Sequence, residues 1–140
     1  EPSIEPILVR HEAAGGFMAM AHALLTGEPA VCFASPGPGA ANLVPALLES
    51  LATCAPVIAL CTGVSGRLDG QGAFQETDQM GMMKPVCKWA VRVPRDVLER
   101  ARADKRADGI IDSPVVAVKR RGRMEPDWSI RLSGGGITRW

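Results

Sequence analysis

Short apolar runs alternate with helix-like segments along most of this 140-residue chain. The apolar runs have the length of buried strands, and the segments between them are rich in Ala, Leu and Met, which favour helix. Glycine or proline separates neighbouring segments and predicts tight turns. This alternation predicts an α/β domain with a parallel sheet and helices on both of its faces. The predicted strands are 7–10, 30–34, 56–61, 86–93 and 115–118, and the predicted helices are 13–26, 40–53, 78–83 and 94–107.

The domain is predicted to cover residues 1–118, and residues 119–140 form an irregular or disordered tail without hydrophobic periodicity. Pro45 and Pro94 are expected in the first turns of their helices, where a missing N–H costs nothing. The chain opens on Glu1 rather than on methionine, and a strand follows within a few residues. We therefore expect a fragment of a longer protein or the product of a broken gene.

Charge and cysteine content narrow the class of protein. A net charge of +1 gives no reason to expect a nucleic-acid or membrane partner, and no apolar run reaches the ~20 residues that span a bilayer. None of the four cysteines forms a CxxC pair. We expect buried free thiols in a reducing cytoplasm rather than disulfides or a metal site.

Glu12 stands where the first predicted strand ends and the first helix begins. In parallel α/β sheets ligands collect at the carboxyl ends of strands, and partial desolvation there would raise the pKa of a carboxylate. Position alone favours a simpler interpretation, in which Glu12 complements the helix dipole. A zinc-protease HExxH motif is excluded, because Gly15 occupies the position of the second histidine.

Two glycine-containing segments could also line a site. The turn that contains Gly37 and Gly39 resembles a dinucleotide fingerprint, but Asn42 replaces the third glycine, so a tight strand-to-helix turn explains it equally well. The loop at 70–76 carries Phe74, Gln75 and Glu76, and such loops line sites or form surface turns. By itself, Lys88 fits a solvated lysine better than an active-site cation.

The order of these segments resembles one family. The segments Val9–Glu12, Ser35–Leu43, Pro56–Leu60, Ala73–Glu76 and Ser113–Val118 together resemble the pyrimidine-binding domain of thiamine-diphosphate enzymes. Within these enzymes the acetolactate synthase large subunit is the most similar. The resemblance covers roughly residues 4–118 and is strongest as far as Arg92.

The resemblance implies a cofactor, a reaction and partners. Thiamine diphosphate would bind between the pyrimidine domain of one subunit and the diphosphate domain of another, in a homodimer or homotetramer. The reaction would decarboxylate a 2-keto acid such as pyruvate and join the acyl unit to a second keto acid. Glu12 would activate the cofactor through its aminopyrimidine ring. The implied cofactor-binding residues are Glu12, Gly37, Pro38, Gly39 and Asn42, and the implied substrate-side residues are Phe74, Gln75 and Lys88.

The chain also departs from the family's pattern. Ala13 and Phe17 stand where Gln and His are common, which leaves a related decarboxylase or acyltransferase open. The Gly-Asp-Gly…Asn motif that holds Mg²⁺ and the diphosphate is missing, and Asp69-Gly70 does not replace it. The domain's first strand and helix and the family's FAD-carrying middle domain are also missing. We expect the isolated chain to be inactive and to be a fragment, a subunit completed by a separate diphosphate-domain chain, or a non-catalytic remnant.

Overall fold

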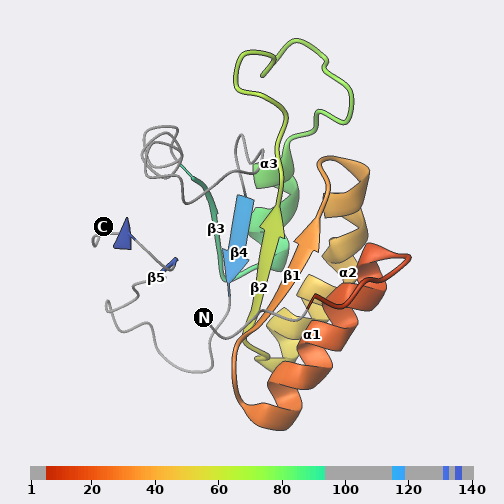
Figure 1. Ribbon diagram of the computed structural model, residues 1–140, viewed down its shortest axis with the longest axis vertical. Helices are drawn as coiled ribbons and strands as arrows, with labels where there is room; N and C mark the ends of the chain where they lie inside the picture. Colours follow the sequence, from red (N-terminus) through yellow and green to blue (C-terminus); the bar gives the residue numbers. More distant parts are fainter. Residues whose placement is uncertain (1–5, 94–114, 119–130, 133–134, 137–140) are drawn as a thin grey trace.

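The computed structural model describes residues 6–93, 115–118, 131–132 and 135–136 (Figure 1). Three α-helices and four strands form its main body, and two short strands pair separately near the end of the chain. In chain order the elements are α1 (Glu12–Thr26), β1 (Ala30–Ala34), α2 (Pro38–Thr53), β2 (Val57–Cys61), α3 (Gln79–Met83), the 3-10 turn η1 (Lys84–Val86), β3 (Trp89–Arg92), β4 (Val115–Val118), β5 (Arg131–Leu132) and β6 (Gly135–Gly136).

The main sheet has the strand order β1-β2-β4-β3. β1 and β2 pair in parallel with Cys32 opposite Ala59, so the predicted α/β class and its parallel strand pair are confirmed. β4 forms where a strand was predicted, but it runs antiparallel to both β2 and β3. The expectation of a wholly parallel sheet is therefore wrong at this strand. An apolar run specifies that a strand is buried and leaves its direction open.

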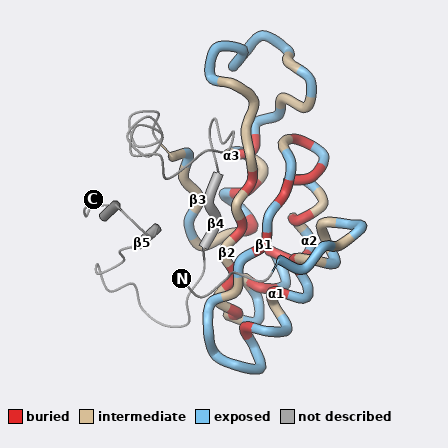
Figure 2. Tube along the Cα trace, viewed as in Figure 1, coloured by how far each residue is buried: buried red, intermediate tan, exposed pale blue. Residues whose placement is uncertain are grey.

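All three described α-helices contribute to one core on a single face of the sheet. Alternate residues of β1 and β2 enter this core, whereas Val31 and Phe33 on the opposite face are 57% and 56% exposed. Figure 2 shows the buried positions concentrated where α1 and α2 meet these strands. The predicted helix at 94–107, the remaining candidate for the second face, lies outside the described residues.

The core side chains between helices and sheet are small. Gly16 of α1 lies so close to Ala46 of α2 that a Cβ atom on Gly16 would come within 2.6 Å of the Ala46 Cβ atom. Ala19 and Ala23 continue the same buried side of α1. Small residues at this crossing let the two helix backbones approach closely and bring the first turns of α1 and α2 together.

Three sequence-based expectations need correction. Residues 7–10 form no strand, and Leu8 is 98% exposed, because the segment pairs with no strand in the described part of the chain. Pro45 lies inside α2 rather than in its first turn, because Pro38 already occupies the start of the helix. The predicted strand at 86–93 is divided between the end of η1 and β3.

The cysteines and the described helices can also be compared with the sequence-based expectations. All four cysteines are free thiols; Cys32 and Cys61 are buried, as predicted, whereas Cys54 and Cys87 are only half-buried. Among the described residues, no helix has both the length and the apolar character needed to cross a membrane. Most of the predicted tail at 119–140 lies outside the described residues, so the domain boundary at 118 stays a prediction.

Candidate functional site

The candidate site lies where the parallel strands β1 and β2 end. The Thr62 amide donates to the Ala34 carbonyl at 3.0 Å, which aligns the carboxyl ends of the two strands. From this edge one chain segment turns into α2, and the other enters the long loop at 62–78 (Figure 1). This edge is the usual place for a ligand in an open α/β sheet.

Glu12 is the first residue of α1 and reaches this edge from the N-terminal side. His11 caps the helix, because its Nδ1 accepts a hydrogen bond from the Ala13 amide at 3.2 Å. The half-buried Glu12 side chain points to α2, where Asn42 Nδ2 donates to Glu12 Oε2 at 3.0 Å. The structure therefore joins two of the predicted cofactor-binding residues, which are 30 positions apart in the chain.

The pKa of Glu12 is lowered from its ordinary value of 4.5. The hydrogen bond from Asn42 is the largest cause, followed by the Glu12 backbone amide, while the His11 ring adds a smaller electrostatic effect. Burial acts in the opposite direction but is too slight to prevail. The expectation that desolvation raises this pKa is therefore wrong for the chain as it stands, because donors to the anion outweigh loss of water.

Gly39 lies directly beside the Glu12 carboxylate. A Cβ atom on this glycine would lie 2.3 Å from Ser35 Oγ and 3.1 Å from Glu12 Oε1. Only a residue without a side chain lets the carboxylate and the serine hydroxyl share this space. The carboxylate thus meets the first turn of α2, the positive end of the helix dipole. Ser35 belongs to the segment Ser35–Leu43, and the sequence alone did not indicate it as a site residue.

Gly37 connects this turn to the loop that carries Phe74. Its φ of 55° is in the left-handed region, and a Cβ atom there would lie 2.5 Å from the Gln75 carbonyl oxygen. Gln75 itself has a φ of 63°, which is uncommon for a residue with a side chain. The backbones of the turn and the loop are therefore in contact, as their assignment to one site requires.

For the remaining predicted site residues, the structure gives a position and a degree of exposure. Phe74 is 88% exposed, and Pro38 is an exposed residue at the start of α2. Lys88 is half-buried between η1 and β3. The substrate-side roles of Phe74, Gln75 and Lys88 stay predictions.

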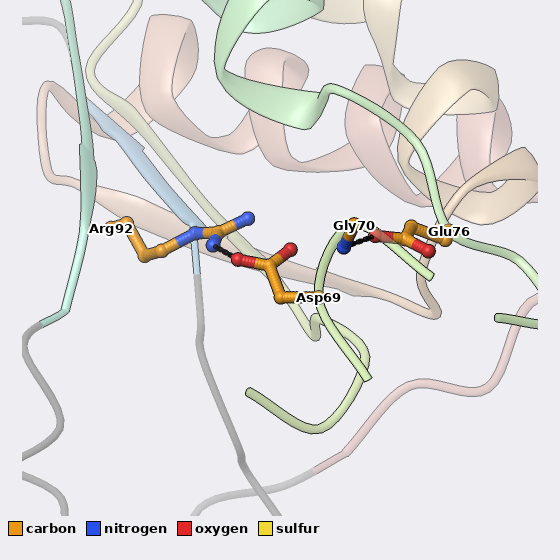
Figure 3. Close-up of polar contacts among 4 residues, drawn as sticks. All are labelled: Asp69, Gly70, Glu76 and Arg92. Atoms are coloured by element: carbon orange, nitrogen blue, oxygen red, sulfur yellow. Dashed lines mark hydrogen bonds and ion pairs between the residues drawn. The ribbon is translucent and has the colours of Figure 1, made fainter. Parts of the chain in front are cut away.

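Glu76 closes the loop that contains Phe74 and Gln75, and the sequence alone indicated it only as a polar group. Its carboxylate accepts a hydrogen bond from the backbone amide of Gly70 (Figure 3) and another from the amide of Ala73 at 2.8 Å. Asp69 at the start of the same segment forms an ion pair with Arg92 of β3, with 2.6 Å between the charged atoms. A glutamate a few residues after closely spaced glycines is the signal that could have indicated this closure.

Gln79 is a second polar residue that the sequence did not single out. It is only 3% exposed, and its Nε2 donates to the Thr62 carbonyl at 3.0 Å, which fixes the start of α3 to the end of β2. Its Oε1 finds no hydrogen-bond partner among the residues that the structure describes. In the part of the chain that is described, no three His, Cys, Asp or Glu residues converge as a metal site would require.

Two family profiles match the chain. The profile described as "Thiamine pyrophosphate enzyme, N-terminal TPP binding domain" matches residues 1–82, which include Glu12, the glycine turn and the loop. A second profile, described as a family of unknown function, matches residues 73–140. The two matches overlap at residues 73–82, from the end of the loop that Glu76 closes into α3.

Individual relatives agree with the first match. The chain is 42% identical over 96 residues to an acetolactate synthase large subunit from Parasynechococcus marenigrum, covering 67% of this chain and 16% of the relative. It is 34% identical over 142 residues to the chloroplastic acetolactate synthase 2 of Nicotiana tabacum, covering 94% of this chain and 21% of the relative. It is 42% identical over 85 residues to the acetolactate synthase isozyme 1 large subunit of Escherichia coli, covering 61% of this chain and 15% of the relative.

The chain thus spans about a sixth to a fifth of the length of these relatives. The profile match covers more than half of its residues, and the matched segment contains the pair Glu12 and Asn42 at the carboxyl edge of the sheet. On this basis the chain belongs to the thiamine pyrophosphate enzyme family and corresponds to its N-terminal, cofactor-binding domain.

Proposed function

We propose that this chain supplies the pyrimidine-binding half of an acetolactate-synthase-like active site. In the complete site a 2-keto acid such as pyruvate is decarboxylated and its acyl unit is joined to a second keto acid. The observation that carries the proposal is the placement of the Glu12 carboxylate, which Asn42 holds against Gly39 at the carboxyl edge of the sheet.

The local geometry fits an aminopyrimidine ring. Gly39 leaves open the space beside Glu12 Oε1 that a Cβ atom would fill, and Gly37 allows the Gln75 backbone to approach from the other side. Glu12, Asn42 and the turn Gly37-Pro38-Gly39 are the residues that would hold the ring. Bound thiamine diphosphate would supply the carbon nucleophile for the keto carbon and the electron sink for decarboxylation.

Glu12 would accept a hydrogen bond from the N1′ position of the ring and control the proton on that ring. In this chain without a covering domain Glu12 is an anion at neutral pH, because its pKa lies below the ordinary value of 4.5. Covering the site with a second domain would remove water from the carboxylate and raise its pKa, which suits a group that exchanges a proton. Asn42 would keep the carboxylate oriented while this happens.

The other half of the site, with Mg²⁺ and the diphosphate, would come from a domain outside this chain. That domain could belong to a homodimer or homotetramer of a longer protein, or to a separate chain. We propose that the isolated chain is inactive and binds no FAD. A reducing, cytoplasmic compartment fits its four free thiols. Conversion of pyruvate to acetolactate by this chain alone would contradict the proposed inactivity.

A chimaera tests the assignment directly. Residues 6–92 of this chain would replace the matching segment of a related acetolactate synthase large subunit, and acetolactate formation would be measured. Glu12→Gln should then lower kcat by about 10²–10⁴-fold, the usual scale for loss of an acid–base group. Glu49→Gln, at an exposed position on α2, is the matched control and should leave kcat unchanged.

The same chimaera separates the alternative functions. Release of an aldehyde from pyruvate with little acetolactate would favour a related decarboxylase. A folded chimaera without any cofactor-dependent turnover would favour a non-catalytic remnant. A Glu12→Gln chimaera with full activity would remove the basis of the proposal.

A further inference from the structure

We propose that Glu76 is a positioning residue, whose carboxylate clamps the segment at 70–76 and thereby sets the Phe74-Gln75 backbone against the Gly37 turn. No role is assigned to Glu76 by the function proposed above. The importance of this placement for a keto acid rests on that function, but the clamp itself does not.

Several backbone N–H groups converge on the carboxylate. One oxygen accepts from Gly70 and the other accepts from Ala73 at 2.8 Å, and the Gly72 amide also lowers the pKa of the group. A carboxylate that accepts several backbone N–H groups makes charge-assisted bonds, which are stronger than bonds between neutral groups. The segment is thus folded around its own glutamate.

This closure constrains the two residues that precede Glu76. The Glu76 amide donates to the Ala73 carbonyl at 2.9 Å, so Phe74 and Gln75 form the tip of a tight turn. The turn holds Gln75 at a φ of 63°, and the Gln75 carbonyl then packs on Gly37. Contacts therefore continue from Glu76 through Gln75 to the turn beside Glu12.

The base of the segment is fixed to the sheet by a second contact. Asp69 pairs with Arg92 of β3, and Figure 3 shows this ion pair next to the bond between Gly70 and Glu76. Asp69 is also the charged neighbour that raises the pKa of Glu76, against the stronger effect of the amides. Pairing with Arg92 offsets part of the charge of Asp69, which limits this repulsion.

Amide NMR on the full chain tests the clamp without any cofactor. The amide protons of Gly70, Gly72 and Ala73 should titrate together, with a midpoint below 4.5, and the Gly37 amide should follow with the same midpoint. Glu76→Gln should abolish this shared titration, whereas Glu49→Gln should preserve it. Different titration midpoints for these amides in the parent chain would overturn the proposal. So would a Gly37 amide whose chemical shift does not change as Glu76 titrates.

Trypsin at neutral pH provides a second measurement if acid unfolds the chain. Arg67 is exposed and lies just before the clamped segment, so cleavage after it reports opening of the loop. Cleavage should be several-fold faster in Glu76→Ala than in Glu49→Gln, with Glu76→Gln in between because it keeps one acceptor oxygen. Equal rates in all three variants would count against a clamp.

The chimaera shows whether the clamp serves the site. Glu76→Gln should raise KM for pyruvate more than it lowers kcat, because the change displaces residues predicted at the substrate end. A loss confined to kcat would assign Glu76 another role. Because NMR and proteolysis involve no cofactor, the clamp and the proposed function can fail independently.

Discussion

Asn42 in α2 donates its side-chain amide to the carboxylate of Glu12 at the start of α1, with 3.0 Å between Nδ2 and Oε2. This bond joins the first turns of two helices that pack on the same face of the sheet. It keeps the pKa of Glu12 below 4.5 and orients the carboxylate beside Gly39. Asn42 therefore lowers the pKa of the proposed cofactor-activating group and sets its direction.

Replacing Asn42 with alanine should raise the pKa of Glu12 towards its ordinary value, because the largest lowering contribution is lost. Carbon-13 NMR titration of the Glu12 carboxyl carbon measures the change. Loss of this bond should also cost about 1 kcal/mol of unfolding free energy at neutral pH. Leu51→Ala, nine residues beyond Asn42 in α2, is a useful control for general destabilisation.

The sign of the accompanying pH dependence follows from the lowered pKa. The contribution of Glu12 to stability is present above its unfolded pKa near 4.5 and is lost as the pH falls through the lower folded value. In Asn42→Ala this part of the acid-induced loss should be smaller. Denaturant titrations from pH 7 down to pH 3 would show it, and parallel curves for the two proteins would contradict it.

Gly39→Ala should destabilise the fold although alanine is the better helix former. Its Cβ atom would lie 2.3 Å from Ser35 Oγ, and crowding of this kind costs about 1–3 kcal/mol, more than the roughly 0.5–1 kcal/mol gained from helix propensity. Removing the hydroxyl in the double variant with Ser35→Ala should recover part of the loss. A double-mutant cycle by urea unfolding measures this coupling, and simple additivity would argue against the contact.

Gly16→Ala should separate α1 from α2. The new methyl group would lie 2.6 Å from the Cβ atom of Ala46, which has no rotamer to change, and we expect a loss of about 1–3 kcal/mol. Gly15→Ala is the matched control, because its Cβ atom would meet only the side chain of Val9 at 3.2 Å. Equal unfolding free energies for the two variants would contradict the proposed close approach of the helices.

The cysteines should differ in reactivity. Burial raises the pKa of Cys32 to about 11 and of Cys61 and Cys87 to about 12, so these thiols stay protonated near pH 8. Half-buried Cys54, at the end of α2, should react first with a maleimide. Mass spectrometry of the native chain should show one fast modification that Cys54→Ser removes, and rapid labelling of Cys61 would contradict the buried core.

These raised values also predict the behaviour at high pH. The folded chain keeps its thiol protons to a higher pH than the unfolded chain, whose thiols titrate at the ordinary value of 9.0. Stability is therefore complete below that value and declines as the pH rises towards about 11–12. Unfolding free energies measured between pH 7 and 10 should decrease, and Cys61→Ser should reduce this decrease.

Much of the fold could be predicted from the sequence because it depends on neighbours along the chain. Apolar run length and alternation indicated β1 and β2, helix-forming composition indicated α1 and α2, and Gly37 with Gly39 marked the turn between strand and helix. The order of these segments also indicated the family. The exposed segment at 7–10 was missed, because strand pairing depends on residues elsewhere in the fold. The interior position of Pro45 was missed, because Pro38 of the same helix already occupies its start.

The tertiary structure alone decided the features that depend on contacts between distant segments. The run Val115–Val118 indicated a buried strand, but only its hydrogen bonds to β2 and β3 set its antiparallel direction. Glu12 could be proposed from the family resemblance, yet the direction of its pKa shift depends on Asn42, 30 residues away. Local propensity acts over a few residues, whereas the charge and orientation of a site depend on donors that packing brings together.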